Sequence, residues 1–559
     1  MLESSRTLLA ASLGVAAGAA LGAWLGRGNA LLRLRLRLAA ALARTVVLSN
    51  VRVPLSLLPP ESRERLAVDA EGPVLCDVSL TDGTICGVGP PASSPASGLT
   101  TATVDGGGAV LVACWADAHT HLVKTHAHPR TRNPTGSISD ALAVECEDQP
   151  RWAACPCCRP IAFGGGGAKT ATADGDVACV PCPRATDVER RMEFAIASAY
   201  HHGTRAMRTH LDGTNSPDPK LRATVYAAFA ACRARWAARG LELQGVANLY
   251  LPLWREAALA QSHADEAAAV EGVILGAYCG NVADTPDEET AEALDSLFGH
   301  ARRLGLQVDV HIDETNEPRC CCLLPLVGAL GRARAAGYTL PVVLGHCTSL
   351  ALQSDATKRA VISGLKGLGA VSVVCNPATN LGLQDRRGSA APHCAPIASD
   401  TPRTPLWRGL APIQELEAAG VRVAAASDNV RDWWHAYGDY DGLATWKGAI
   451  TLGQLDTAPC EGAWAHVVSD AAAAAMGVAD GAAFAPGARA DLILFPGARR
   501  LSELLSRPQS DRLVLRGGRV QQSRLPRYEE LDDIVGVVTT LPEELGGAGV
   551  QRGATAVGA

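Results

Sequence analysis

Residues 109–121 read Ala-Val-Leu-Val-Ala-Cys-Trp-Ala-Asp-Ala-His-Thr-His, an apolar run that leads into two histidines separated by one residue. The apolar part, residues 109–113, is typical of a parallel β-strand that is buried on both faces. His119 and His121 lie two positions apart on an extended chain, so both side chains point to one side and can bind one metal ion. This stretch predicts a buried strand with a metal site at its end.

Seven later segments have the same form, a short apolar run that ends in polar residues. They are residues 203–210, 241–248, 270–278, 306–311, 340–346, 370–376 and 421–428. Stretches of helical character, such as residues 187–202 and 291–304, separate most of them. Eight strands that alternate with helices predict a (β/α)8 TIM-type barrel, whose active site lies at the C-terminal ends of the strands.

Further metal-binding side chains stand at the ends of these strands. His311 ends the fifth strand, His346 the sixth and Asp428 the eighth. Neutral imidazole suits zinc or iron, and one carboxylate completes a site that keeps a position for water. A metal bound there lowers the pKa of that water from about 16 to about 7, which supplies hydroxide at neutral pH. The pattern therefore predicts a metal-dependent hydrolase.

Several motifs around these residues occur in a fixed order. They include Asp-Ala-His-Thr-His-Leu (117–122), Arg-Thr-His-Leu-Asp (208–212), Asp-Val-His-Ile-Asp-Glu (309–314), Leu-Gly-His-Cys-Thr (344–348) and Ser-Asp-Asn-Val-Arg-Asp-Trp-Trp (427–434). In these motifs the chain resembles the amidohydrolase superfamily, and within it the cytosine deaminases, over roughly residues 46–522. The resemblance implies one divalent metal ion, Fe²⁺ or Zn²⁺. Its implied ligands are His119, His121, His311 and Asp428.

The resemblance also implies roles in catalysis and substrate binding. His346 would hydrogen-bond the attacking hydroxide, Glu314 would carry protons to a ring nitrogen, and Asp428 would help to deliver a proton to departing ammonia. Gln244 and Trp434 would contact the ring. The implied reaction is deamination of a small nitrogen heterocycle, with cytosine, converted to uracil and ammonia, as the leading substrate.

Asn429 is a further predicted substrate contact, but it departs from the resemblance, because the bacterial cytosine deaminases carry at this position a second aspartate that contacts the ring. An amide donates as well as accepts hydrogen bonds, whereas an ionised carboxylate only accepts them. Isocytosine, an amino-triazine, a creatinine-like ring or a cyclic amide therefore remain alternative substrates. A catalytically inactive binding protein is a further alternative. The fourth strand, 272–278, lacks the lysine that binuclear members of the superfamily require, so the site is predicted to be mononuclear.

The 559 residues exceed one barrel and leave room for further parts. The barrel is predicted over residues 109–479. Strand-like runs in 46–108 and 480–522 predict a small β-sandwich built from both ends of the catalytic region. Residues 523–559 turn acidic and then rich in glycine and alanine, which predicts a partly disordered tail.

The net charge of −6 and the lack of a basic stripe argue against nucleic acid as a partner. The expected partner is a small-molecule substrate. The resemblance also implies that the chain forms a homo-oligomer.

The N-terminal segment, residues 1–45, contains an uncharged run at 8–26 that is just long enough to span a bilayer. Several arginines follow it. The uncharged run followed by arginines predicts either an anchor that leaves the catalytic domain in the cytosol or an organelle transit peptide. The 18 cysteines are scattered through a large chain, which favours a reducing compartment.

A separate group of cysteines lies in an apparent insertion at about 151–184. The pairs Cys155/Cys158 and Cys179/Cys182 have the spacing of a four-cysteine structural zinc site. The alternative is a glycine-rich insertion with incidental cysteines. A triplet at 320–322 precedes an apolar stretch and is expected to pack against it.

Overall fold

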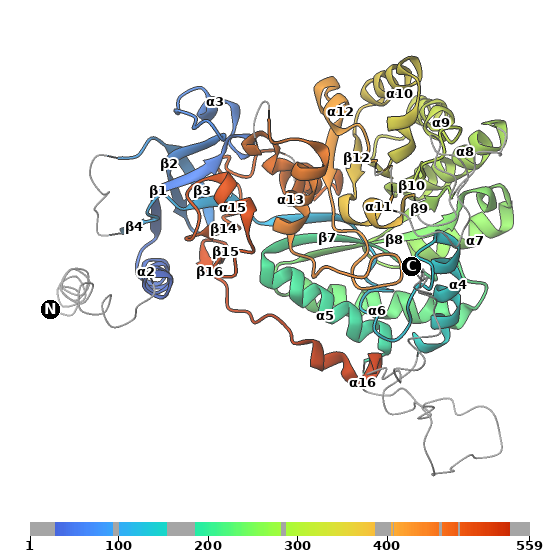
Figure 1. Ribbon diagram of the computed structural model, residues 1–559, viewed down its shortest axis with the longest axis horizontal. Helices are drawn as coiled ribbons and strands as arrows, with labels where there is room; N and C mark the ends of the chain where they lie inside the picture. Colours follow the sequence, from blue (N-terminus) through green and yellow to red (C-terminus); the bar gives the residue numbers. More distant parts are fainter. Residues whose placement is uncertain are drawn as a thin grey trace, which may run out of the picture.

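The computed structural model describes residues 28–92, 100–153, 185–280, 287–385, 404–405, 407, 409–457, 461–478 and 481–536. Two eight-stranded sheets organise this part of the chain. One is a barrel, and the other is made from segments near both chain ends. Figure 1 shows these N-terminal and C-terminal segments, in blue and red, together beside the barrel.

The barrel strands are all parallel and follow one another in chain order. They are β6 (Trp115–Thr120), β7 (Thr204–His210), β8 (Glu242–Tyr250), β9 (Val273–Tyr278), β10 (Val308–Ile312), β11 (Val342–His346), β12 (Val371–Cys375) and β13 (Arg422–Ala425). A parallel bridge between Thr120 and Asp428 joins the first strand to the end of the last. The predicted (β/α)8 barrel is confirmed.

Helices surround the barrel (Figure 1). They are α4 (Ile138–Asp148), α5 (Asp187–His202), α6 (Pro219–Ala237), α7 (Ala257–Ala268), α8 (Asp287–Leu304), α9 (Leu323–Ala335), α10 (Asp355–Leu368), α11 (Pro377–Leu383), α12 (Ile413–Ala419) and α13 (Gly442–Gly453). Neighbours pack against one another, α5 on α6 and α8 on α9. The short helix α14 (Asp470–Ala475) packs against β6 and β13.

Helix α5 shows why these segments are helical. The Thr186 side chain accepts a hydrogen bond from the backbone N–H of Glu189, which caps the first turn. Gly203 ends the helix with a φ of 106°, a conformation that glycine adopts without a steric cost. Between them, the buried residues Val188, Met192 and Ala195 recur at helical spacing and form the face toward the barrel.

The second sheet joins the two ends of the described chain. Its strands are β1 (Thr45–Pro54), β2 (Pro73–Thr81), β3 (Thr84–Gly89), β4 (Thr101–Asp105), β5 (Val110–Ala113), β14 (Leu492–Phe495), β15 (Leu513–Arg516) and β16 (Arg519–Val520). The antiparallel pairing of β5 with β14 makes the connection between the ends. Strand β1 pairs with β4 through residues 45–49 and with β5 at Arg52, so all eight strands form one connected sheet.

The apolar run at 109–113 is not the first barrel strand. It forms β5 in the second sheet, and the chain enters the barrel only after Cys114, as β6. The prediction was wrong because an apolar run covered on both faces looks the same in either sheet. Strand β6 carries Asp117 and His119 among its buried residues, and this polar content hid it from a search for apolar runs.

Two segments outside the barrel differ from expectation. Residues 28–42, within the predicted anchor or transit segment, form helix α2 (Gly28–Leu42), which packs against β4 and β16. The start of the predicted disordered tail is ordered. Residues 528–535 form a 3-10 turn (Tyr528–Leu531) and helix α16 (Asp532–Val535), and Leu531 and Ile534 pack on Phe194 of α5.

Within the part of the chain that the structure describes, no helix is both long enough and apolar enough to cross a membrane. This finding contradicts the membrane-anchored localisation predicted from residues 8–26, and the predicted membrane association is withdrawn. Residues 8–26 themselves lie outside the described residues.

Candidate active site

Four predicted metal ligands meet at the C-terminal ends of the barrel strands. Nε2 of His311 lies 3.1 Å from Nε2 of His119 and 3.1 Å from Nε2 of His121. Oδ1 of Asp428 lies 3.6 Å from Nε2 of His119 and 3.3 Å from Nε2 of His121. The four side chains are almost wholly buried. Strand ends far apart in the sequence therefore aim four ligand atoms at one point.

The spacing of these atoms fits one small divalent cation. A tetrahedral ion with bonds of about 2.0–2.2 Å holds its ligand atoms about 3.3–3.6 Å apart. Burial lowers the pKa of His119, His121 and His311 well below 6.5, which leaves the rings neutral, as metal ligands must be. Burial, and then the neighbouring Glu314 carboxyl, raise the pKa of Asp428 well above its usual value. Among the described residues neither Asp428 oxygen has a hydrogen-bond partner, so both oxygens are available to a cation.

A second layer of side chains orients the histidines. Nδ1 of His121 lies 3.0 Å from a carboxylate oxygen of Asp212. Nδ1 of His119 lies 3.1 Å from Nε2 of His210, whose Nδ1 is 2.9 Å from the Asn248 amide group. The structure places the side-chain nitrogen of Asn248 toward His210. With the amide turned by 180°, so that its oxygen faces His210, each ring donates one N–H outward and Nε2 of His119 keeps a free lone pair. This orientation also gives the otherwise unpartnered Asn248 oxygen a hydrogen bond.

This layer was not predicted, although a signal was present. His210, Asp212 and Asn248 all lie at the ends of predicted strands, where ligands were sought. Second-layer partners of this kind fix the tautomer and the orientation of ligating histidines. The same strand-end reasoning that selected His311 would have found them.

Glu314 and His346 lie beside the four ligands. Oε1 of Glu314 is 3.3 Å from Nδ1 of His346, and the same ring atom is 4.0 Å from Oδ2 of Asp428. Burial raises the pKa of Glu314 to about 7, against the lowering effect of Lys124. A carboxyl group with a pKa near neutrality can both accept and donate a proton at pH 7.

The backbone turns sharply where these side chains leave the strands. Asp313, His346 and Asp428 have φ values of 54°, 71° and 61°, in the left-handed region that side chains other than glycine seldom adopt. Such conformations persist only where the surroundings hold them, and they gather at active sites. The turns direct Glu314, His346 and Asp428 toward a common space.

A buried lysine and its partners form a second group next to the ligands. Nζ of Lys124 lies 3.2 Å from Asp212 and 3.6 Å from Glu145, and it sits 4.7 Å from the centre of the Trp434 ring. Nε1 of Trp434 in turn donates to Glu145 at 3.3 Å. Lys124 is only 4% exposed. Trp434 therefore lies beside the candidate site, and its N–H already has a partner.

Asn429 also lies next to the site, immediately after Asp428. Its side-chain nitrogen donates to Asp432 at 2.8 Å, and its backbone N–H donates to Thr379 at 3.2 Å. Asp432 also accepts from the backbone N–H of Trp434 at 2.9 Å. Asn429 therefore links the end of β13 to the segment that carries Trp434.

Gln244 does not reach the candidate site. It lies near the start of β8, four residues before Asn248, which is roughly 13 Å away at about 3.3 Å per residue. Its side chain accepts from Arg208 at 2.8 Å and donates to the backbone oxygen of Met476 at 3.2 Å. The predicted substrate contact came from the motif resemblance alone, and the structure places Gln244 near the start of β8, away from the strand end that carries the candidate site.

The four cysteines of the predicted structural zinc site, Cys155, Cys158, Cys179 and Cys182, lie outside the described residues. That site stays a prediction.

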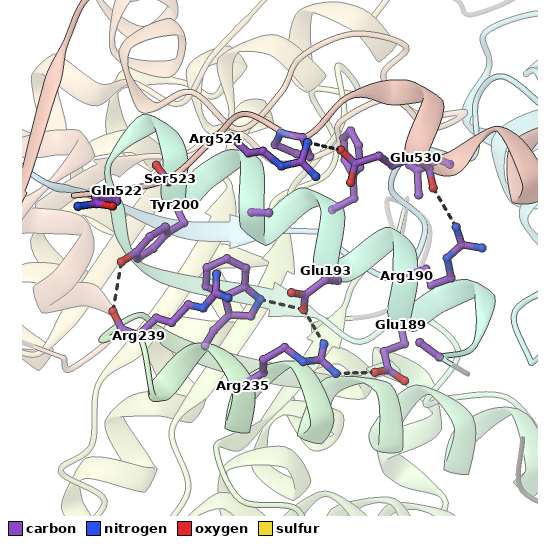
Figure 2. A pocket seen from close by; sticks show the side chains of 16 residues that line it. Glu189, Arg190, Glu193, Tyr200, Arg235, Arg239, Gln522, Ser523, Arg524 and Glu530 are labelled. Carbon is purple, nitrogen blue, oxygen red and sulfur yellow. Dashed lines mark hydrogen bonds and ion pairs between the residues drawn. The ribbon is translucent and has the colours of Figure 1, made fainter. Parts of the chain in front are cut away.

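A surface cavity of about 410 Å³ lies elsewhere, between α5, α6 and residues 522–531 (Figure 2). Its charged side chains pair with one another. Arg235 donates to Glu189 and Glu193, and Arg524 donates to Glu530. None of the predicted catalytic residues lines it, so this cavity is not the candidate active site.

Comparisons with known proteins agree with the fold. Residues 255–522 match the family model described as "Amidohydrolase family". A pterin deaminase from Rhizobium rhizogenes is 35% identical over 499 residues, which cover 88% of this chain and 98% of that protein.

Two solved structures share the fold at lower identity. The 5-methylcytosine deaminase of Klebsiella pneumoniae has a TM-score of 0.61 at 20% identity, with 87% of this chain and 98% of that chain covered. N-isopropylammelide isopropylaminohydrolase of Burkholderia multivorans has a TM-score of 0.59 at 20% identity, with 85% and 97% covered. The chain belongs to the amidohydrolase superfamily and is a hydrolase of carbon–nitrogen bonds.

Proposed function

We propose that the chain is a mononuclear, metal-dependent deaminase that removes the amino group of a pterin and releases ammonia. The reaction type rests on one observation above all. His119, His121, His311 and Asp428 converge within 3.1–3.6 Å, next to a Glu314 whose pKa is about 7. The pterin substrate rests on the 35% identity, over 88% of the chain, to the pterin deaminase.

Cytosine, the leading substrate predicted from the sequence, has weaker support. The 5-methylcytosine deaminase of Klebsiella pneumoniae shares only 20% identity with this chain, and a likeness at that level supports the fold alone. Asn429 also stands where the bacterial cytosine deaminases carry an aspartate. Both substrates contain an amino-bearing carbon beside a ring nitrogen, so the same catalytic groups serve either one.

The side chains suit hydrolysis at such a carbon. A divalent cation held by the four ligands would lower the pKa of water and supply hydroxide at neutral pH. Glu314 takes a proton from the attacking water and gives it to the ring nitrogen next to the reacting carbon, which breaks the C=N double bond. His346, 3.3 Å from Glu314, hydrogen-bonds the attacking oxygen. The last proton moves from that oxygen to the amino group, ammonia departs and a C=O bond remains.

The lysine-centred group provides the substrate contacts in this proposal. A pterin presents hydrogen-bond donors and acceptors along both of its rings. Lys124 offers a cationic donor, Glu145 and Asp212 offer acceptors, and Trp434 offers a flat wall. A bicyclic substrate extends further from the reacting carbon than a single pyrimidine ring. Its second ring would therefore make more contacts with these side chains.

The test is ammonia release from a panel of pterin, isocytosine, cytosine and an amino-triazine, with the oxo product identified by mass spectrometry. Isocytosine is the pyrimidine half of pterin and controls for the second ring. The expected result is fast release from pterin and slow release from isocytosine. Release from cytosine but not from pterin would favour the pyrimidine alternative. No release from any amino compound, with one metal ion bound, would overturn the deaminase proposal.

The Glu314→Gln variant is the matched control for this panel. It should bind the metal and release no ammonia above background from any substrate. Release at the wild-type rate would show that the activity comes from a contaminant or from another site.

A further inference from the structure

A group of buried thiols lies around Asp313, the residue before Glu314. Cys279 follows β9, and Asp313 follows β10. Cys320 and Cys322 belong to the loop that leads from β10 to α9. Three of these side chains are wholly buried and Cys322 is 5% exposed. Two neighbouring strand ends and one loop therefore bring three thiols and a carboxylate together.

The ligand atoms of this group lie close to one another. Sγ of Cys320 is 3.5 Å from Oδ1 of Asp313. The ligand atoms of Asp313, Cys320 and Cys322 all lie within 4.8 Å of one another. The Cys322 thiol also hydrogen-bonds the Cys279 thiol.

We propose that Cys279, Cys320, Cys322 and Asp313 form a second metal site, which binds one zinc ion or a similar soft divalent cation. Thiolate sulfur is the preferred ligand of such cations, and structural zinc sites are four-coordinate and closed to solvent. The three thiols release their protons to solvent as the cation binds. The resulting charge, three thiolates and one carboxylate around a divalent ion, equals that of a four-cysteine zinc site.

The surroundings of Asp313 favour a cation over packing alone. Its carboxylate accepts from the backbone N–H groups of Cys322 at 2.8 Å and Leu323 at 3.4 Å and from the Cys320 and Cys322 thiols, and all four are neutral donors. A wholly buried carboxylate is costly unless it is paired with a positive charge or bound to a metal. Buried thiols that serve only as apolar fillers would not need to gather around such a group.

The second site would fix the segment that positions the catalytic acid. Asp313 directly precedes Glu314, and its φ of 54° turns the chain between the two side chains. A cation on Asp313 would tie this turn to the start of α9 and to the end of β9. Its role would be to position Glu314, because none of its four ligands contributes to the catalytic cluster.

Cobalt substitution tests the site without reference to activity. The full-length chain, reduced and freed of metal, is titrated with Co²⁺. Cysteine thiolates give a charge-transfer band in the near ultraviolet when they ligate cobalt, whereas histidine and carboxylate ligands do not. The wild-type chain should show such a band. The Cys320→Ser/Cys322→Ser variant should lose this band and should bind one equivalent of metal less.

Two matched controls separate this site from other cysteines. Cys86→Ser removes an exposed thiol of the second sheet, and Cys155→Ser/Cys158→Ser removes half of the predicted site in the insertion. Both controls should retain the band attributed to the proposed site. A wild-type chain without a thiolate–cobalt band, or a band that survives Cys320→Ser/Cys322→Ser unchanged, would overturn the proposal.

Thiol protection in the wild-type chain tests the site even when the double variant does not fold. Zn²⁺ should protect Cys320 and Cys322 from an alkylating reagent, as read by peptide mass spectrometry, and a chelator should remove the protection. Equal labelling with and without Zn²⁺ would overturn the proposal.

Discussion

Oε1 of Glu314 lies 3.3 Å from Nδ1 of His346, although the two residues follow different strands, β10 and β11. The same imidazole nitrogen is 3.0 Å from the side-chain nitrogen of Asn380, which holds the ring in place. One oriented ring therefore faces the carboxyl group that we propose as the proton carrier. The contact defines where the attacking oxygen and the ring nitrogen of a substrate have to lie.

Replacing Glu314 with glutamine should stop turnover while the metal stays bound. The amide has the same shape but cannot carry a proton between water and the substrate. We expect kcat to fall by about 10²–10⁴-fold, the usual contribution of a general acid or base. Metal content, measured by elemental analysis, should not change. Glu317→Gln, which changes a half-buried carboxylate on the same loop, is the control and should keep kcat.

The pH profile of kcat/KM should report the same carboxyl group. Burial raises the pKa of Glu314 to about 7 from 4.5, so the metal-free group is protonated below about pH 7. Glu314 has to be ionised to take a proton from water, so activity should fall as the pH falls through its pKa. A bound cation acts in the opposite direction and lowers the pKa. The acid limb should therefore lie between the ordinary value of 4.5 and about 7. A profile that stays flat across this interval would contradict the assignment.

Removing the second-layer carboxylate should weaken metal binding without removing a ligand. Asp212 lies 3.0 Å from Nδ1 of His121 and fixes the orientation of that ring. Loss of such a partner costs about 10–100-fold in metal affinity or activity. We expect a shift of that size in competition with a chelator for Asp212→Asn. Asp218→Asn on the same loop keeps a helix-capping side chain and should show wild-type affinity.

The convergence of the four predicted metal ligands could be expected from the sequence because it follows from topology. Parallel strands end on the same side of a barrel, so His311 and Asp428 could be placed beside His119 before any coordinates were known. The contacts of Lys124 could not be predicted in this way. Its partners Glu145 and Trp434 come from loops and helices, and no repeat in the sequence indicates how those segments fold over the strand ends.

Gln244 shows the limit of the motif resemblance. The residue was placed beside the substrate from the order of motifs, but the position of a side chain along a strand depends on where the strand ends. Strand β8 runs to Tyr250, so the residue at the upper end is Asn248. The predicted strand 241–248 already placed Gln244 near its start, so the position along the strand should have outweighed the motif match.

Gln244→Ala should consequently affect stability and leave substrate binding unchanged. The Gln244 oxygen accepts two hydrogen bonds from the buried Arg208 guanidinium, at 3.0 and 2.8 Å. Leaving a buried charged donor without this partner should cost about 1–3 kcal/mol of unfolding free energy. Urea denaturation and steady-state kinetics on the same preparation measure both effects. A rise in KM at unchanged stability would restore the predicted substrate contact.

Replacing Arg130 should destabilise the fold far more than replacing a neighbouring surface arginine. The Arg130 side chain is 3% exposed and pairs with Asp148 at 2.6 Å and with Asp187 at 2.5 Å, both buried. Removing one partner of a buried ion pair costs about 3–5 kcal/mol, because a buried charge is left uncompensated. Arg190 makes a similar contact with Asp533, whose side chain is 56% exposed, and such a pair contributes about 0–1 kcal/mol. Urea unfolding should therefore separate Arg130→Met from Arg190→Met by at least about 2 kcal/mol. Equal losses would show that burial of the Arg130 pairs adds nothing to stability.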